Sequence, residues 1–135
     1  MKKILFAAIT LVISFGTAFA QQETMTPEEK EKKLTELIQQ QVEKLETSLK
    51  LEDWQTFYAD SILTHDYHAL QEELDALQDA KVSNRDLYTK ASDKWAEKIY
   101  VAMRGILNDE QWSKYLKGGA ASEKKARDKR NAKEQ

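Results

Sequence analysis

The sequence predicts an all-α protein, for three reasons. Only five of the 135 residues are Gly or Pro, against roughly 12% in ordinary proteins. Between Pro27 and Gly118 the sole such residue is Gly105, so hairpin turns and Gly-rich phosphate loops lack the residues they need. Apolar residues also recur at helical spacing, and helix-capping patterns recur along the chain. We therefore expect three long amphipathic helices plus one short helix, in a thin helical hairpin or cradle.

The first twenty residues, MKKILFAAITLVISFGTAFA, are typical of a secretory signal peptide. Two lysines precede an apolar run over residues 4–15, and residues 18–20 (Ala-Phe-Ala) place small side chains at a cleavage site. The apolar run is shorter than a membrane span requires. We therefore predict a cleaved signal peptide at 1–20, export to the periplasm and no stable membrane insertion, with an uncleaved anchor as the alternative.

The charge of the remaining chain is unevenly distributed. Residues 21–116 carry 12 basic and 20 acidic side chains, whereas residues 117–135 carry 7 basic and 3 acidic ones. An acidic body argues against nucleic-acid binding. The chain has no Cys, which excludes disulfides and thiolate metal sites. We predict a flexible N-terminus at 21–25, a helical domain at 26–117 and a basic disordered tail at 118–135, with a fraying helix as the alternative for the tail.

Capping residues set the expected helix boundaries. Thr26 and Pro27, followed by Glu29, form a capping box with Pro at the first helical position, which starts a helix that reaches about residue 49. Further helices are expected from residue 51 to about 80, from 83 to about 106 and from 108 to 117. The two glycines at 118–119 are expected to end the last helix. Gly105 is expected to permit a close helix crossing or a bend.

The helix expected over residues 51–80 has two apolar faces. Trp54, Phe57 and Tyr58 lie on one side of its helical wheel, and Leu63, Tyr67, Leu70, Leu74 and Leu77 lie about 180° away. Such a helix either bends near residues 62–66 or packs its two halves on different partners. Because thin helical bodies often complete their core by association, we expect a homodimer.

Three helix starts share one pattern, in which an apolar residue and a cap are followed by Glu or Gln at the third helical position. They are Met25-Thr26-Pro27-Glu28-Glu29, Leu51-Glu52-Asp53-Trp54-Gln55 and Leu107-Asn108-Asp109-Glu110-Gln111. The last residue of each can reach back to the N–H of its cap. The pattern resembles the LTxxQ motif that the Spy/CpxP family of small periplasmic stress proteins carries twice. Its motif positions here are Leu51, Gln55, Leu107, Asn108 and Gln111, with Glu52 and Asn108 in place of the motif's Thr.

The resemblance covers residues 25–117 and implies a cradle-shaped helical dimer that either holds unfolded proteins without ATP or reports envelope stress by binding a sensor. We therefore expect a chaperone-like periplasmic protein whose partners are unfolded or partly folded clients. The candidate client-binding residues are Trp54, Phe57, Tyr58, Trp112 and Tyr115, for which core packing is the alternative. Two other functions stay open: an envelope-stress or metal-responsive adaptor for one folded partner, and a helical interaction protein without client activity.

His65, His68 and Glu72 are spaced to share one helix face and could together bind Zn²⁺. A solvated polar face is the alternative, and we expect no cofactor. No enzyme activity is expected either, because Ser61, His65 and Asp66 lie on one helix without a nucleophile turn or an oxyanion hole.

Overall fold

A computed structural model describes residues 25–134 of the chain. Within them lie, in order, α2 (Pro27–Leu49), α3 (Asp53–Asp79), α4 (Arg85–Ile106), α5 (Asp109–Tyr115), the π-helical turn η1 (Leu116–Ala120) and α6 (Ala121–Lys133). This part of the chain contains no strand, which confirms the predicted all-α fold. The predicted signal peptide at 1–20, and residues 21–24 of the predicted flexible segment, lie outside the described residues.

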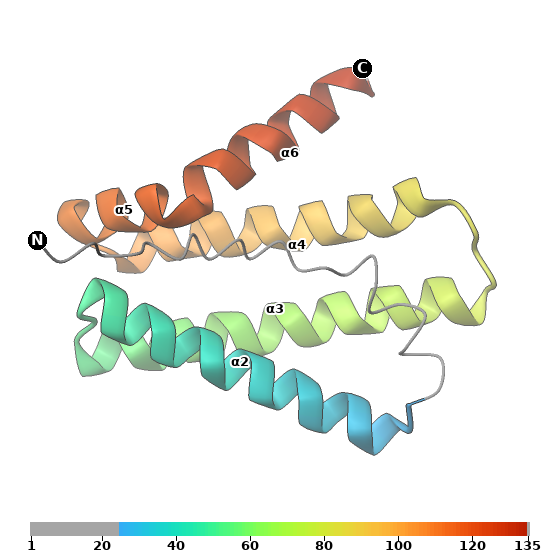
Figure 1. The fold of residues 1–135 in the computed structure, drawn as a ribbon, viewed down its shortest axis with the longest axis horizontal. Coiled ribbons are helices and arrows are strands. Elements are labelled where there is room, and N and C mark those ends of the chain that lie inside the picture. The colour runs from blue at the N-terminus through green and yellow to red at the C-terminus, as the bar shows by residue number, and fades with distance from the viewer. Residues whose placement is uncertain (1–24, 135) are drawn as a thin grey trace, which may run out of the picture.

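Each of the three long helices runs antiparallel to the one before it, and α3 lies between α2 and α4 and packs against both (Figure 1). After α4 the chain reverses through α5, and α6 then runs back in the opposite direction to α4 and at an angle to it (Figure 1). None of the helices in residues 25–134 combines the length and the apolarity that a membrane span requires.

The core consists of two apolar clusters along α3. The larger joins α2 to α3 and α4, and its buried members are Leu34, Ile38, Val42, Leu63, Tyr67, Leu70, Leu74 and Ala91. The smaller lies where α2 ends and α4 meets α5, and its buried members are Leu49, Ala59, Met103 and Leu107.

The buried side of α3 differs from the prediction for residues 51–80. That side is continuous from Gln55 and Ala59 to Leu74, and the aromatic residues on the other side of the first half are exposed. The two halves therefore share one core face. The prediction was wrong here because it considered large apolar residues alone, whereas a glutamine and an alanine occupy the first buried positions of this helix.

The connections between the helices contain little glycine, as the composition implied. Lys50 and Lys81 take the left-handed conformation (φ 51° and 55°) after α2 and α3, a conformation that costs a non-Gly residue about 1–2 kcal/mol. Gly105 does not permit a close helix crossing, contrary to the prediction, because a Cβ atom built on it would meet nothing within 4 Å.

The predicted disordered tail at 118–135 is also corrected, since residues 121–133 form α6. The glycines at 118–119 do not end the helical region but redirect it at Gly119, where φ is 123°. The tail was predicted to be disordered, or at most a fraying helix, because it has no large apolar residue to bury. Its basic side chains instead pair with acidic side chains of α4, and Arg127 is buried.

Candidate functional site

The two best matches to the repeated helix-start pattern meet in space through a pair of buried glutamines. Gln55 Nε2 donates to Gln111 Oε1 at 2.6 Å, and Gln111 Nε2 donates to Gln55 Oε1 at 3.0 Å. Both side chains are buried, with exposed fractions of 3% and 7%. The glutamine pair thus joins the start of α3 to the start of α5.

Each glutamine also forms hydrogen bonds with backbone groups at the helix ends around it. Gln55 Oε1 accepts from the N–H of Glu52, and Gln111 Oε1 accepts from the N–H of Asn108, the N-cap residue of its own helix. Gln55 Nε2 donates to the carbonyl of Ile106 at the end of α4, and Gln111 Nε2 donates to that of Leu49 at the end of α2. In each side-chain amide, both N–H hydrogens and both lone pairs of the oxygen therefore have a hydrogen-bond partner. This near-symmetric arrangement assigns a structural role to the motif positions Gln55, Asn108 and Gln111.

Two of the five predicted client-binding residues, Trp112 and Tyr115, pack beside this junction. Both are partly buried against the smaller core cluster, with their ring centroids 5.5 Å apart. Burial raises the pKa of the Tyr115 hydroxyl above its usual range. The motif residues Leu51 and Leu107 belong to the same cluster. For Trp112 and Tyr115 the structure thus favours the core-packing alternative.

The other three predicted client-binding residues form an exposed patch at the start of α3. Trp54, Phe57 and Tyr58 have exposed fractions of 50%, 67% and 51%. The Tyr58 ring meets both neighbours edge to face, with centroid distances of 6.2 Å to Trp54 and 5.6 Å to Phe57. The Trp54 indole N–H also donates to the carboxylate of Glu52. We call these three residues the aromatic patch.

The predicted metal ligands are engaged separately. His65 Nδ1 lies 2.8 Å from Asp66 Oδ1, while His68 Nε2 lies 2.9 Å from Glu31 Oε1 on α2. The hydrogen bond to Glu31 raises the pKa of His68. Within residues 25–134 no group of three or more metal-ligating side chains is arranged to hold a metal ion. His68 therefore bridges α2 and α3 rather than converging with His65 and Glu72.

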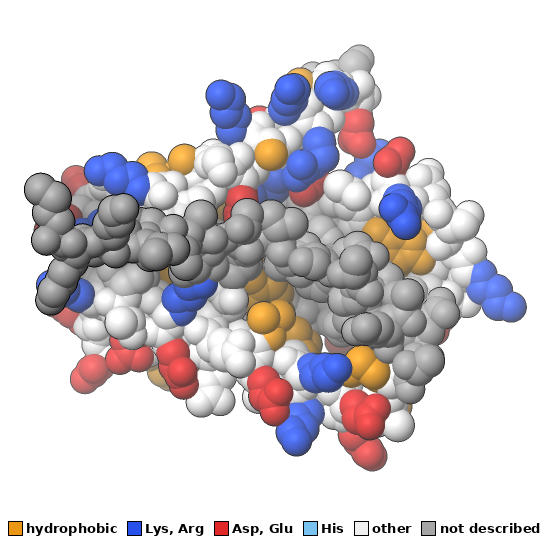
Figure 2. Space-filling model, viewed as in Figure 1, with side chains coloured by type: hydrophobic (Ala, Val, Ile, Leu, Met, Phe, Trp, Pro, Cys, Tyr) orange, Lys and Arg blue, Asp and Glu red, His pale blue; other side chains and the backbone are white. Residues whose placement is uncertain are grey.

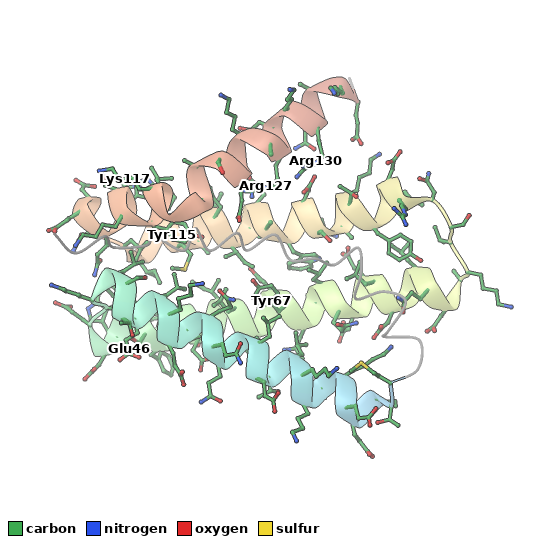
Figure 3. All side chains as sticks on the ribbon, viewed as in Figure 1. Glu46, Tyr67, Tyr115, Lys117, Arg127 and Arg130 are labelled. Atoms are coloured by element: carbon green, nitrogen blue, oxygen red, sulfur yellow. The ribbon has the colours of Figure 1, made fainter. Side chains whose placement is uncertain are left out.

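Sequence reasoning missed a further polar contact, which we call the α4–α6 interface. Arg130 contacts Asp93 through two hydrogen bonds of 2.7 Å, and Arg127 contacts Glu97 through two of 3.3 and 3.2 Å. Figure 3 shows both arginines on the side of α6 that faces α4. Lys124 also donates to Glu97. The spacing of acids along α4 and of bases along residues 124–130 is visible in the sequence and could have predicted this contact.

Three tyrosines, Tyr67, Tyr100 and Tyr115, lie close to the start of α6, and we call them the tyrosine layer. The guanidinium of Arg127 lies 5.7 Å from the ring centroid of Tyr100 on α4. Burial raises the pKa of Tyr67 to about 12, and the charge of Glu123 on α6 adds to that rise. Figure 3 shows Tyr67 on α3 and Tyr115 beneath α5, on the side of α5 that faces α2 and α3. The α6 helix thus contacts polar and aromatic groups instead of an apolar groove.

Comparisons with family models, with curated proteins and with solved structures found no match for this chain.

Proposed function

We propose that this protein binds unfolded or partly folded polypeptides without a nucleotide, and that the aromatic patch is the contact surface. The supporting observation is the exposure of three adjacent aromatic side chains on one helix. Aromatic rings supply much contact area at a small entropic cost and are enriched in binding surfaces. Leaving them in water is unfavourable, so exposed apolar clusters of this kind commonly mark binding sites.

The charge around the aromatic patch favours basic clients. Asp53 and Asp60 lie on the first half of α3 and Glu52 directly precedes it, and residues 21–116 have a net charge of −8. In Figure 2, Lys and Arg side chains predominate along the upper margin over α6, whereas acidic ones are more frequent along the lower margin over α2. Long-range attraction would therefore bring basic or weakly charged unfolded chains to the body and repel acidic ones.

The test is suppression of aggregation for several unrelated substrates at equimolar protein. The double variant Trp54→Ala/Phe57→Ala is expected to lose most of this suppression while keeping its helical circular dichroism. The matched control, Leu87→Ala/Val101→Ala, removes two exposed apolar side chains from α4 (40% and 61% exposed) and is expected to retain it. Absence of suppression by the unmodified protein at tenfold excess would refute client binding. Capture of one folded partner instead would support the adaptor function.

We also propose that the protein acts in the periplasm after removal of residues 1–20. The support is the sequence of that segment, with its basic start, apolar run and small residues before Gln21. The mass of the protein recovered from the periplasm tests this proposal. A chain that begins at Gln21 is expected, and a full-length chain retained in the membrane fraction would contradict it.

A further inference from the structure

The region from α5 to α6 departs from a continuous helix at one residue. Gly119 has φ 123° and ψ −19°, whereas Leu116, Ala120 and Ala121 all have helical backbone angles. Glycine enters this conformation freely, while residues with a Cβ rarely do. If Gly119 rotated to helical angles, residues 109–133 would form one straight helix. That helix would carry α6 away from its own α4.

The contacts that hold α6 in place repeat in a regular antiparallel register. Successive pairs join Glu134 to Lys90, Arg130 to Asp93, Arg127 to Glu97 and Lys124 to Tyr100. Each step of three or four residues along α6 is accompanied by a step of three or four residues back along α4. The sequence of α6 has no large apolar residue, so no hydrophobic core ties this helix to its own chain.

We propose that Gly119 is a hinge, and that α4 accepts α6 from a second copy of this chain. The accepting face of α4 carries the acidic residues Asp93 and Glu97 and the aromatic residue Tyr100. The occupant is identified by charge and by register. Residues 117–135 have a net charge of +4 against −8 for residues 21–116, and the same antiparallel pairs form whichever copy supplies the helix. Because each copy both gives and receives α6, the exchange closes as a two-fold dimer. This inference does not depend on client binding.

The first experiment compares Gly119→Ala with Gly118→Ala by sedimentation over a range of concentrations. Alanine favours a helical backbone about fivefold over glycine, and at position 119 it also disfavours the bent form. Gly118→Ala is the matched control, since a Cβ there meets nothing within 4 Å and Gly118 has no positive φ. We expect Gly119→Ala to raise the dimer association constant by about tenfold or more, with little change for Gly118→Ala. Equal constants for the two variants would overturn the proposal.

The second experiment inverts the charges and does not alter the hinge. One variant carries Asp93→Arg/Glu97→Arg and the other Arg127→Glu/Arg130→Glu, so each alone opposes like charges at the α4–α6 interface. Mixing them restores opposite charges only between chains. Native mass spectrometry is expected to show monomers for each variant and a heterodimer for the mixture. A mixture without heterodimer, or variants that dimerise alone as the unmodified protein does, would refute the exchange.

Discussion

The glutamine pair and the α4–α6 interface both join segments distant in sequence, but they use opposite chemistry. Gln55 and Gln111 are neutral and buried, and they bond to each other and to backbone groups at the helix ends. At the α4–α6 interface, by contrast, the side chains are charged, and each pair has one partly exposed member: Arg130 (47%) against Asp93 (15%), and Glu97 (37%) against Arg127 (5%). A buried hydrogen bond is costly to break because its partner is left unsatisfied, whereas an exposed ion pair exchanges readily with water and salt.

This difference divides the molecule into a fixed body and a displaceable arm. The glutamine pair fixes the starts of α3 and α5 against the ends of α2 and α4. The arm, α6, is joined to that body through Gly119 and through charged side chains. Changes to the body should therefore alter the stability of the whole protein, whereas changes to the arm should alter only its docking.

Replacing Gln55 by alanine should destabilise the whole body. The change leaves the carbonyl of Ile106 and the amide of Gln111 without their buried partner and creates a small cavity. We expect a loss of about 3 kcal/mol in the free energy of unfolding, measured by urea titration. Gln39→Ala, at an exposed site on α2, is the control and should cost less than about 0.5 kcal/mol. Similar losses for both variants would show that the pair is not a structural centre.

Replacing Arg127 by alanine should loosen α6 while the body stays folded. Arg127 is buried and holds Glu97 through two hydrogen bonds, but Lys124 still reaches that carboxylate in the variant. We expect the docking of α6 to weaken by about 1 kcal/mol, seen as about fivefold faster amide hydrogen exchange in residues 121–133. The exposed residue Lys129 offers a control with the same change of charge. Faster exchange throughout α3 would contradict the division into body and arm.

The same division explains which features the sequence could predict. Caps at Thr26 and Asn108 act within three residues, so the sequence alone set the starts of two helices correctly. The helix expected from residue 83 begins at Arg85, with Asn84 as its cap. The pairing of Gln55 with Gln111 spans 56 residues and depends on how α3 and α4 pack. Local patterns carry no information about such packing. The motif was recognised as a repeat, but its two copies could not be placed against each other.

The predictions of client-binding residues were limited in the same way, because the sequence could not tell exposed aromatic side chains from buried ones. Trp54 and Trp112 were both predicted to contact clients, yet the first is half exposed and the second packs on the core. Helical periodicity groups residues on a face but does not say what covers that face. The α6 helix was missed for another reason, because apolar content was the criterion and α6 docks through charge.

Raising the salt concentration should separate the two regions without any mutation. Between 0.1 and 1 M NaCl the Debye length falls from about 10 Å to about 3 Å, which weakens exposed ion pairs far more than buried amides. We expect hydrogen exchange in α6 to accelerate about threefold, while exchange near Gln55 is unchanged. If both regions respond alike, the contrast between a neutral and an ionic junction is incorrect.

The smallest expected effect concerns Glu123, which lies on α6 above the tyrosine layer. Burial raises the pKa of its carboxyl group, and the charge of Arg127 opposes that rise only in part. Because the docked state favours the protonated form, docking is strongest below the ordinary carboxyl pKa and weakens as the pH rises through the raised one. Glu123→Gln removes the unfavourable burial of an ionised carboxylate. At pH 7 the α6 helix of this variant should therefore dock more tightly, by about 0.5 kcal/mol or less. At pH 4 the two proteins should exchange alike in residues 121–133, and a difference that persists there would mean that packing rather than ionisation limits docking.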